Sequence, residues 1–128
     1  MTGDAAATNL ALARIGVGTG AYAAPNLAGR LIGLDPAGNP QAPYLARLFG
    51  IRDLALGAGT LATTGQARRT WILAGLACDA ADAVAAVLGR RSGYLSAPVS
   101  ALLAAPALSA VVLGALALQQ SSDAPAQA

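Results

Sequence analysis

The sequence predicts an all-α fold, a four-helix transmembrane bundle with a short interfacial helix between helices 1 and 2. Hydrophobic residues make up 55% of the 128 residues and charged residues 11%, whereas about a quarter of the residues of a soluble domain are charged. Every charge is Arg or Asp, so the Lys and Glu that normally cover soluble helices are missing. Residues 92–122 contain no charge, and this uncharged segment is longer than the roughly 20 apolar residues of a membrane-spanning helix.

The first two long helices are predicted at residues 5–24 and 43–63. Pro25 should end the first, because proline cannot donate a backbone hydrogen bond, and Pro43 fits the first turn of the second. Between them, three leucines follow the i, i+4, i+7 spacing of an amphipathic helix that lies along the membrane interface. This apolar stripe consists of Leu27, Leu31 and Leu34.

The third and fourth long helices are predicted at residues 70–88 and 95–118. Gly89 is the expected end of the third helix. Pro106 lies inside the fourth and should bend it, since it removes one backbone hydrogen bond that neighbouring helices must then compensate.

At this length the chain forms one compact unit rather than two ordinary domains. We predict a single four-helix membrane domain at residues 1–120 and a disordered polar tail at residues 121–128. The aromatic side chains support these boundaries, because rings at helix ends anchor at the level of the lipid headgroups. They are Tyr22, Tyr44, Trp71 and Tyr94.

Composition excludes several classes of function. The net charge of +2 comes with no basic cluster beyond the arginine pairs at 68–69 and 90–91 and with no nucleic-acid-binding motif, so nucleic acid is not an expected partner. The single cysteine, Cys78, excludes an internal disulfide and a CxxC motif. The chain has no histidine, which excludes bis-His haem and the usual transition-metal sites. We therefore expect no cofactor and no metal, and we assign no catalytic residue.

Five charged residues lie well inside the predicted membrane segments. Arg14 is near the middle of the first helix, Arg52 and Asp53 are near the midpoint of the second, and Asp79 and Asp82 are near the middle of the third. A charge at the centre of a membrane helix costs about 2.5–3.5 kcal/mol on insertion scales. These side chains are therefore expected to pair with one another inside the bundle, as a buried charge network and candidate functional site.

Helical geometry predicts how these charges pair. Arg52 and Asp53 are neighbours, about 100° apart around the helix, so we expect them to point toward different partners. Asp79 and Asp82 share one helix face, and the planar fork of Arg52 is expected to bridge both carboxylates. Arg14 is the expected counter-charge of Asp53.

Arg47 decides the charge balance of this interior. If Arg47 points inward, three arginines face three aspartates and the interior is neutral. If it instead reaches the membrane interface, one negative charge remains unbalanced, which favours the protonated form of one aspartate.

Five glycines are predicted to let neighbouring helices approach closely. Gly16 and Gly20 form a GxxxG pair, a common helix-packing motif in lipid. Gly50 and Gly57 lie on the side of the second helix that carries its aspartate, and Gly75 shares the acidic face of the third.

The segment FGIRDLALG at residues 49–57 resembles a motif of a group of small actinobacterial four-helix membrane proteins of unknown function. The resemblance covers about residues 9–118. It includes an RxxG-like segment at Arg14, the segment that begins at Pro25, the RxFGxRDLxLG-like stretch from Arg47, and an Asp-rich third helix. It implies a fold and a multi-pass location in a bacterial cytoplasmic membrane, and no activity. A looser similarity links the chain to DoxX-like membrane proteins, which are associated with redox partners.

Three classes of function follow from these observations. The first is a non-catalytic bundle, an accessory subunit or homo-oligomer in which the charges act as a structural clasp. The second is a small transporter or proton-conducting protein that uses the midplane carboxylates of Asp53, Asp79 and Asp82. The third, an intramembrane enzyme, has the least support, because no nucleophile or metal constellation accompanies the carboxylates. The expected partners are the lipid bilayer and a second copy or another membrane protein.

Overall fold

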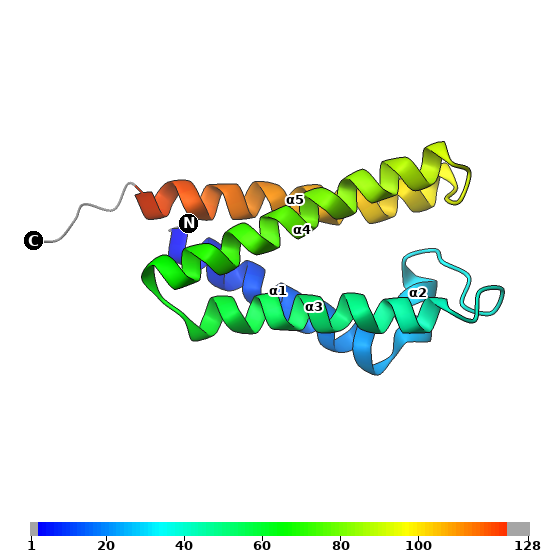
Figure 1. Cartoon of the computed structure of the whole chain (residues 1–128), viewed down its shortest axis with the longest axis horizontal. Coiled ribbons are helices and arrows are strands. Elements are labelled where there is room, and N and C mark those ends of the chain that lie inside the picture. Colours follow the sequence, from blue (N-terminus) through cyan, green and yellow to red (C-terminus); the bar gives the residue numbers. More distant parts are fainter. Residues whose placement is uncertain (1–2, 123–128) are drawn as a thin grey trace, which may run out of the picture.

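The computed structural model describes residues 3–122, which form five helices and no strand (Figure 1). The prediction of an all-α fold is confirmed, and a short helix lies between the first two long ones. The helices are α1 (Gly3–Ala23), α2 (Pro25–Leu31), α3 (Ala42–Ala62), α4 (Gly65–Arg91) and α5 (Ala97–Ser122).

The predicted end of the third long helix at Gly89 is wrong. Helix α4 begins at Gly65, earlier than expected, and continues past Gly89 to Arg91. The chain leaves the helix at Gly93, which has a φ of 78°. There the Tyr94 N–H donates to the Gly89 carbonyl at 2.9 Å, and the Gly93 N–H donates to the Arg90 carbonyl at 3.2 Å. This pair of bonds is a Schellman motif, which needs the left-handed conformation that glycine adopts easily.

Helix α5 continues to Ser122, so residues 121–122 are helical and the predicted disordered tail is wrong for them. Residues 123–128 of that tail lie outside the described residues. Pro106 lies inside α5, as the sequence predicts.

Helix α2 uses proline and glycine at its two ends. Pro25 occupies its first turn, and Gly33, at a φ of 80°, follows its last turn. Pro25 and Gly29 are buried, whereas Leu27 and Leu31, two members of the apolar stripe, are 56% and 71% exposed. The apolar face of α2 therefore points away from the other helices.

The long helices form two closely packed pairs, α1 with α3 and α4 with α5. The pairs are joined by contacts of α1 with α5 and of α3 with α4. Figure 1 shows them converging at the end that carries the α3–α4 connection and diverging toward the end that carries α2. At the open end, a Cβ at Gly33 would lie 2.8 Å from Cγ2 of Val99, so the segment after α2 packs against the start of α5.

Helices α1 and α3 touch through glycine backbone. A Cβ at Gly18 would lie 2.6 Å from the Gly50 carbonyl oxygen, and a Cβ at Gly57 would lie 2.6 Å from the Ala11 carbonyl oxygen. Gly16 and Gly20 make no such contact within the described residues, because both face outward and a Cβ added at either would meet no atom within 4 Å. Their role in packing against another helix therefore stays a prediction. Gly18, between them, makes the contact instead.

Small side chains fill the interior and large ones cover the surface. Of the eleven buried apolar residues within residues 3–122, nine are alanine, and the other two are Leu56 and Ile72. The buried polar residues include the charged side chains of Arg14, Asp53 and Asp79. Leucine, valine and isoleucine side chains are exposed along every long helix. A soluble domain shows the opposite distribution, with large apolar groups inside and charges in water.

Two of the helices in residues 3–122, α4 and α5, are long and apolar enough to cross a membrane. Their most apolar stretches have mean hydropathies of 1.8 and 2.3, and only 28% and 17% of those stretches is buried. The core helix of a soluble protein would be mostly buried. Helices α1 and α3 each contain 21 residues, enough length for a bilayer, but both carry charges at mid-length.

Candidate functional site

The structure brings the five predicted network residues together where α1, α3 and α4 meet. Helix α1 contributes Arg14, α3 contributes Arg52 and Asp53, and α4 contributes Asp79 and Asp82. The three groups nearest the centre are almost fully enclosed, at 7% exposure for Arg14, 6% for Asp53 and 5% for Asp79.

Arg14 is shared by two buried carboxylates. Its Nη1 donates to Asp53 Oδ1 at 3.3 Å and to Asp79 Oδ1 at 3.2 Å, and its Nη2 donates to Asp79 Oδ2. The bond to Asp53 is the one that the sequence predicts. The two-point contact with Asp79 uses the planar fork of the guanidinium. We call these three residues the inner triad.

Gly75 makes room for the guanidinium of the inner triad. It lies one turn before Asp79 on α4, and a Cβ at this position would lie 2.9 Å from Nη2 of Arg14. A larger residue here would therefore require the guanidinium of Arg14 to shift. The predicted packing glycine thus admits a charged side chain rather than the backbone of a neighbouring helix.

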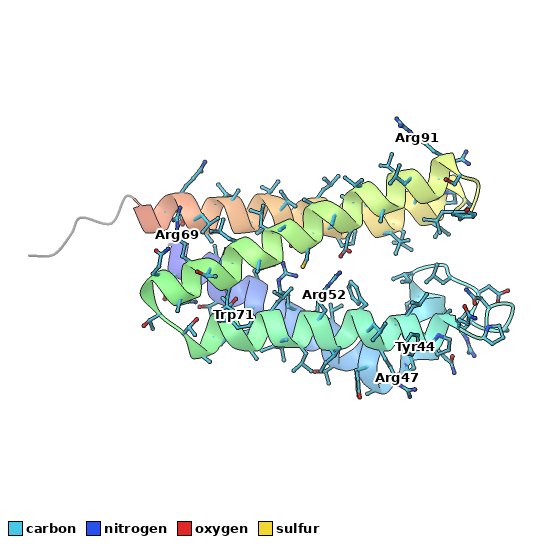
Figure 2. The ribbon with its side chains drawn as sticks, viewed as in Figure 1. Tyr44, Arg47, Arg52, Arg69, Trp71 and Arg91 are labelled. Carbon is cyan, nitrogen blue, oxygen red and sulfur yellow. The ribbon has the colours of Figure 1, made fainter. Side chains whose placement is uncertain are left out.

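Arg52 pairs with Asp82 alone at short range. Its Nη1 and Nη2 donate to the two Asp82 carboxylate oxygens at 3.0 and 2.6 Å, and its guanidinium carbon lies 4.7 Å from the centroid of the Phe49 ring. Figure 2 shows Arg52 rising from α3 toward α4. We call Arg52 and Asp82 the outer pair, because each side chain is 32% exposed.

The predicted bridge from Arg52 to both α4 aspartates is wrong. Arg14, whose guanidinium passes close to Gly75, forms the hydrogen bonds with Asp79. Arg52 therefore bonds only to Asp82 of these two aspartates. The expected separation of Arg52 from Asp53 is also incomplete, because Nη2 of Arg52 lies 3.7 Å from Oδ1 of Asp53. Asp53 therefore connects the inner triad with the outer pair.

Arg47 does not join the network. Its side chain is exposed, and its Nε donates to the Tyr22 carbonyl at the end of α1, at 3.2 Å. Three carboxylates in the network therefore face two guanidiniums, which leaves one formal negative charge when all three are ionised. Arginine stays protonated in proteins, so the aspartates are the groups of this network that can exchange a proton.

Arg68 forms a further link that the sequence reasoning missed. It pairs with Asp4 on α1, and its Nη2 donates to the Thr8 hydroxyl at 2.9 Å. The signal is the eleven-residue spacing from Arg68 to Asp79, about three helical turns, which places both on one face of α4. This face of α4 thus carries charged links to α1 at two levels.

A hydroxyl joins α4 to α5 outside the network. The buried Ser100 hydroxyl donates to the Ala86 carbonyl at 2.9 Å. Among residues 3–122, no three His, Cys, Asp or Glu side chains are grouped to hold a metal ion.

The chain matches no protein-family model, no curated protein and no solved structure. Its function is therefore argued from the placement of its own residues. The central feature is a buried, charge-paired junction of three helices in a molecule whose outer surface is apolar.

Proposed function

We propose that the chain is a multi-pass protein of a bacterial cytoplasmic membrane, in which four long helices cross the bilayer. In this role it acts as a non-catalytic bundle, an accessory subunit or homo-oligomer held together by its Arg/Asp network. The observation that supports this most is the placement of large apolar side chains outside and of Arg14, Asp53 and Asp79 inside. Lipid is the solvent in which that distribution is favourable.

Helix lengths agree with four crossings. At about 1.5 Å per residue, the 21 residues of α1 and of α3 extend about 31 Å, close to the roughly 30 Å hydrocarbon core. Pairing in the inner triad and outer pair offsets the cost of carrying charges at this depth, which is about 2.5–3.5 kcal/mol for each unpaired charge.

Aromatic and leucine side chains support this placement at the open end of the bundle. Tyr22, Tyr44 and Tyr94 are 49%, 64% and 85% exposed there, as expected of rings at the headgroup level. The exposed Leu27 and Leu31 give α2 an outward apolar face, which suits a helix that lies along the interface.

Two observations support a structural role for the network. Every network side chain bonds to another helix of the same chain, so the charges determine which helices pack together. The outward-facing Gly16 and Gly20, with open space around them, leave a face of α1 that another helix can approach closely. A second copy or another membrane protein is the proposed partner.

A second candidate function, proton conduction, is favoured by the charge balance. The network carries one carboxylate more than its guanidiniums neutralise, and the outer pair is one-third exposed. A carboxylate in that setting can take up and release a proton.

We expect proteoliposomes containing the pure chain to hold a pH gradient as well as protein-free liposomes do, because paired charges offer no continuous path. A pH-sensitive dye trapped inside measures the leak. Faster dissipation of the pH gradient that disappears in Asp53→Asn, but persists in the exposed control Asp35→Asn, would replace the structural role with proton conduction.

The subunit role further requires that the chain crosslinks in native membranes to itself or to one protein at a fixed ratio.

A further inference from the structure

An apolar groove lies on the outside of the bundle between α4 and α5. It has a volume of about 360 Å³, and its lining includes Ala83 and Val87 of α4 and Ala104 and Leu108 of α5. The small alanines on the two helices leave the depression between the larger side chains. Arg91, in the last turn of α4, is the charged residue of the lining.

We propose that this groove binds one acyl chain of an anionic phospholipid, whose phosphate group pairs with Arg91. The inference rests on the proposed membrane location and adds a specific ligand to it. A phospholipid is complementary to this groove. Its apolar acyl chain matches the apolar lining, and its negatively charged phosphate group matches the positive charge of Arg91. Figure 2 shows Arg91 pointing away from the bundle, where a lipid headgroup can reach it.

The dimensions of the groove agree with one leaflet. Ala83 and Arg91 are eight residue steps apart on α4, which extend about 12 Å along the helix axis at about 1.5 Å each, while half of the hydrocarbon core is roughly 15 Å. Arg91 lies three residues before Tyr94, which is 85% exposed and close to the headgroup level in the proposed placement. The cation thus lies at the interface and the groove below it in the acyl chains.

The charge of the region suits an anion. The sequence contains no acidic residue from Ala83 to Ser122, and the preceding acid, Asp82, is bonded to Arg52. Within residues 3–122, no ion pair occupies Arg91. A guanidinium bonds phosphate oxygens in a two-point contact, and anionic lipid adds attraction by its net charge.

Arg90 provides a matched control, because it has the same charge at nearly the same depth but does not line the groove. We titrate the delipidated full chain in detergent with phosphatidylglycerol or phosphatidylcholine and count bound lipids by native mass spectrometry. We expect phosphatidylglycerol to bind more tightly. Arg91→Gln should weaken its binding about fivefold, and Arg90→Gln should leave it unchanged. Equal binding of the two lipids, or equal loss in both variants, would overturn the proposal.

A second pair of variants tests the apolar part of the groove. Ala104→Leu fills it, whereas Ala105→Leu adds the same volume at an exposed position outside it. The first should reduce the number of retained lipids and the second should not. If Ala104→Leu instead dissociates a dimer with no loss of lipid, a second copy occupies the groove and the proposal is wrong. A chain that integrates into membranes but retains no phosphatidylglycerol contradicts this inference and leaves the proposed function intact.

Discussion

Arg14→Ala is expected to lower the free energy of unfolding by about 3–5 kcal/mol, the largest effect of any single charge removal in this chain. Arg14 is 7% exposed and donates to both Asp53 and Asp79. Its loss leaves two buried carboxylates without their main counter-charge. Unfolding in mixed micelles, followed by circular dichroism as the denaturing detergent is raised, measures the change.

Arg30→Ala is the matched control for this experiment. Arg30 is an exposed residue of α2, and its removal should change the free energy of unfolding by less than about 0.5 kcal/mol.

A double-mutant cycle tests whether the inner triad and the outer pair are energetically separate. The coupling free energy between Arg14→Ala and Asp79→Asn should be large. The coupling between Arg14→Ala and Asp82→Asn should be clearly smaller, because Asp82 is hydrogen-bonded to Arg52. Equal coupling to both aspartates would show that the inner triad and outer pair are not distinct.

Gly18→Ala is expected to lower the free energy of unfolding by about 1–3 kcal/mol, through overpacking. The added Cβ would lie 2.6 Å from the Gly50 carbonyl oxygen and 2.7 Å from the Leu54 backbone nitrogen. Both atoms belong to backbone, so relief requires α1 and α3 to move apart. That movement also disturbs the contact between Arg14 and Asp53, which the same two helices hold.

Gly16→Ala provides a control of opposite sign on the same helix. Its Cβ would meet no atom of the described residues within 4 Å, and replacing a mid-helix glycine with alanine adds about 0.5–1 kcal/mol of stability. The same micelle unfolding experiment compares the two variants. A larger loss in Gly16→Ala than in Gly18→Ala would mean that α1 packs on α3 through its other face.

The sequence predicts the number and order of the long helices because proline, glycine and the apolar runs mark their ends. It also predicts which charges pair inside the bundle, since a charge inside an apolar run needs a partner, although Arg52 and Asp82 remain one-third exposed. The rotation of each helix could not be predicted in the same way. In helix α1 the GxxxG spacing drew attention to Gly16 and Gly20, whereas Gly18 lies four residues after Arg14 and therefore on the same helix face. That spacing is the signal that separates Gly18 from the other two glycines.

The assignment of Asp79 to Arg52 failed for a related reason. Arg52 and Arg14 both have the reach and geometry to bond Asp79, and the choice depends on the relative height and rotation of three helices. Gly75 decides it by opening a path for Arg14, a role that is visible only when α1 and α4 are placed together. The position of Arg47 outside the network depends equally on the packing of α3 against α1.

The most direct test of the four-span arrangement is the side of the membrane on which each connection lies. Single cysteines introduced by Ala37→Cys, Thr64→Cys or Ser92→Cys, in a Cys78→Ala chain, report the α2–α3, α3–α4 and α4–α5 connections, where all three positions are exposed. An impermeant maleimide applied to one side of sealed vesicles should label positions 37 and 92 together and position 64 only from the other side. Labelling of positions 37 and 64 from the same side would show that α3 does not cross, and would contradict the four-helix membrane bundle.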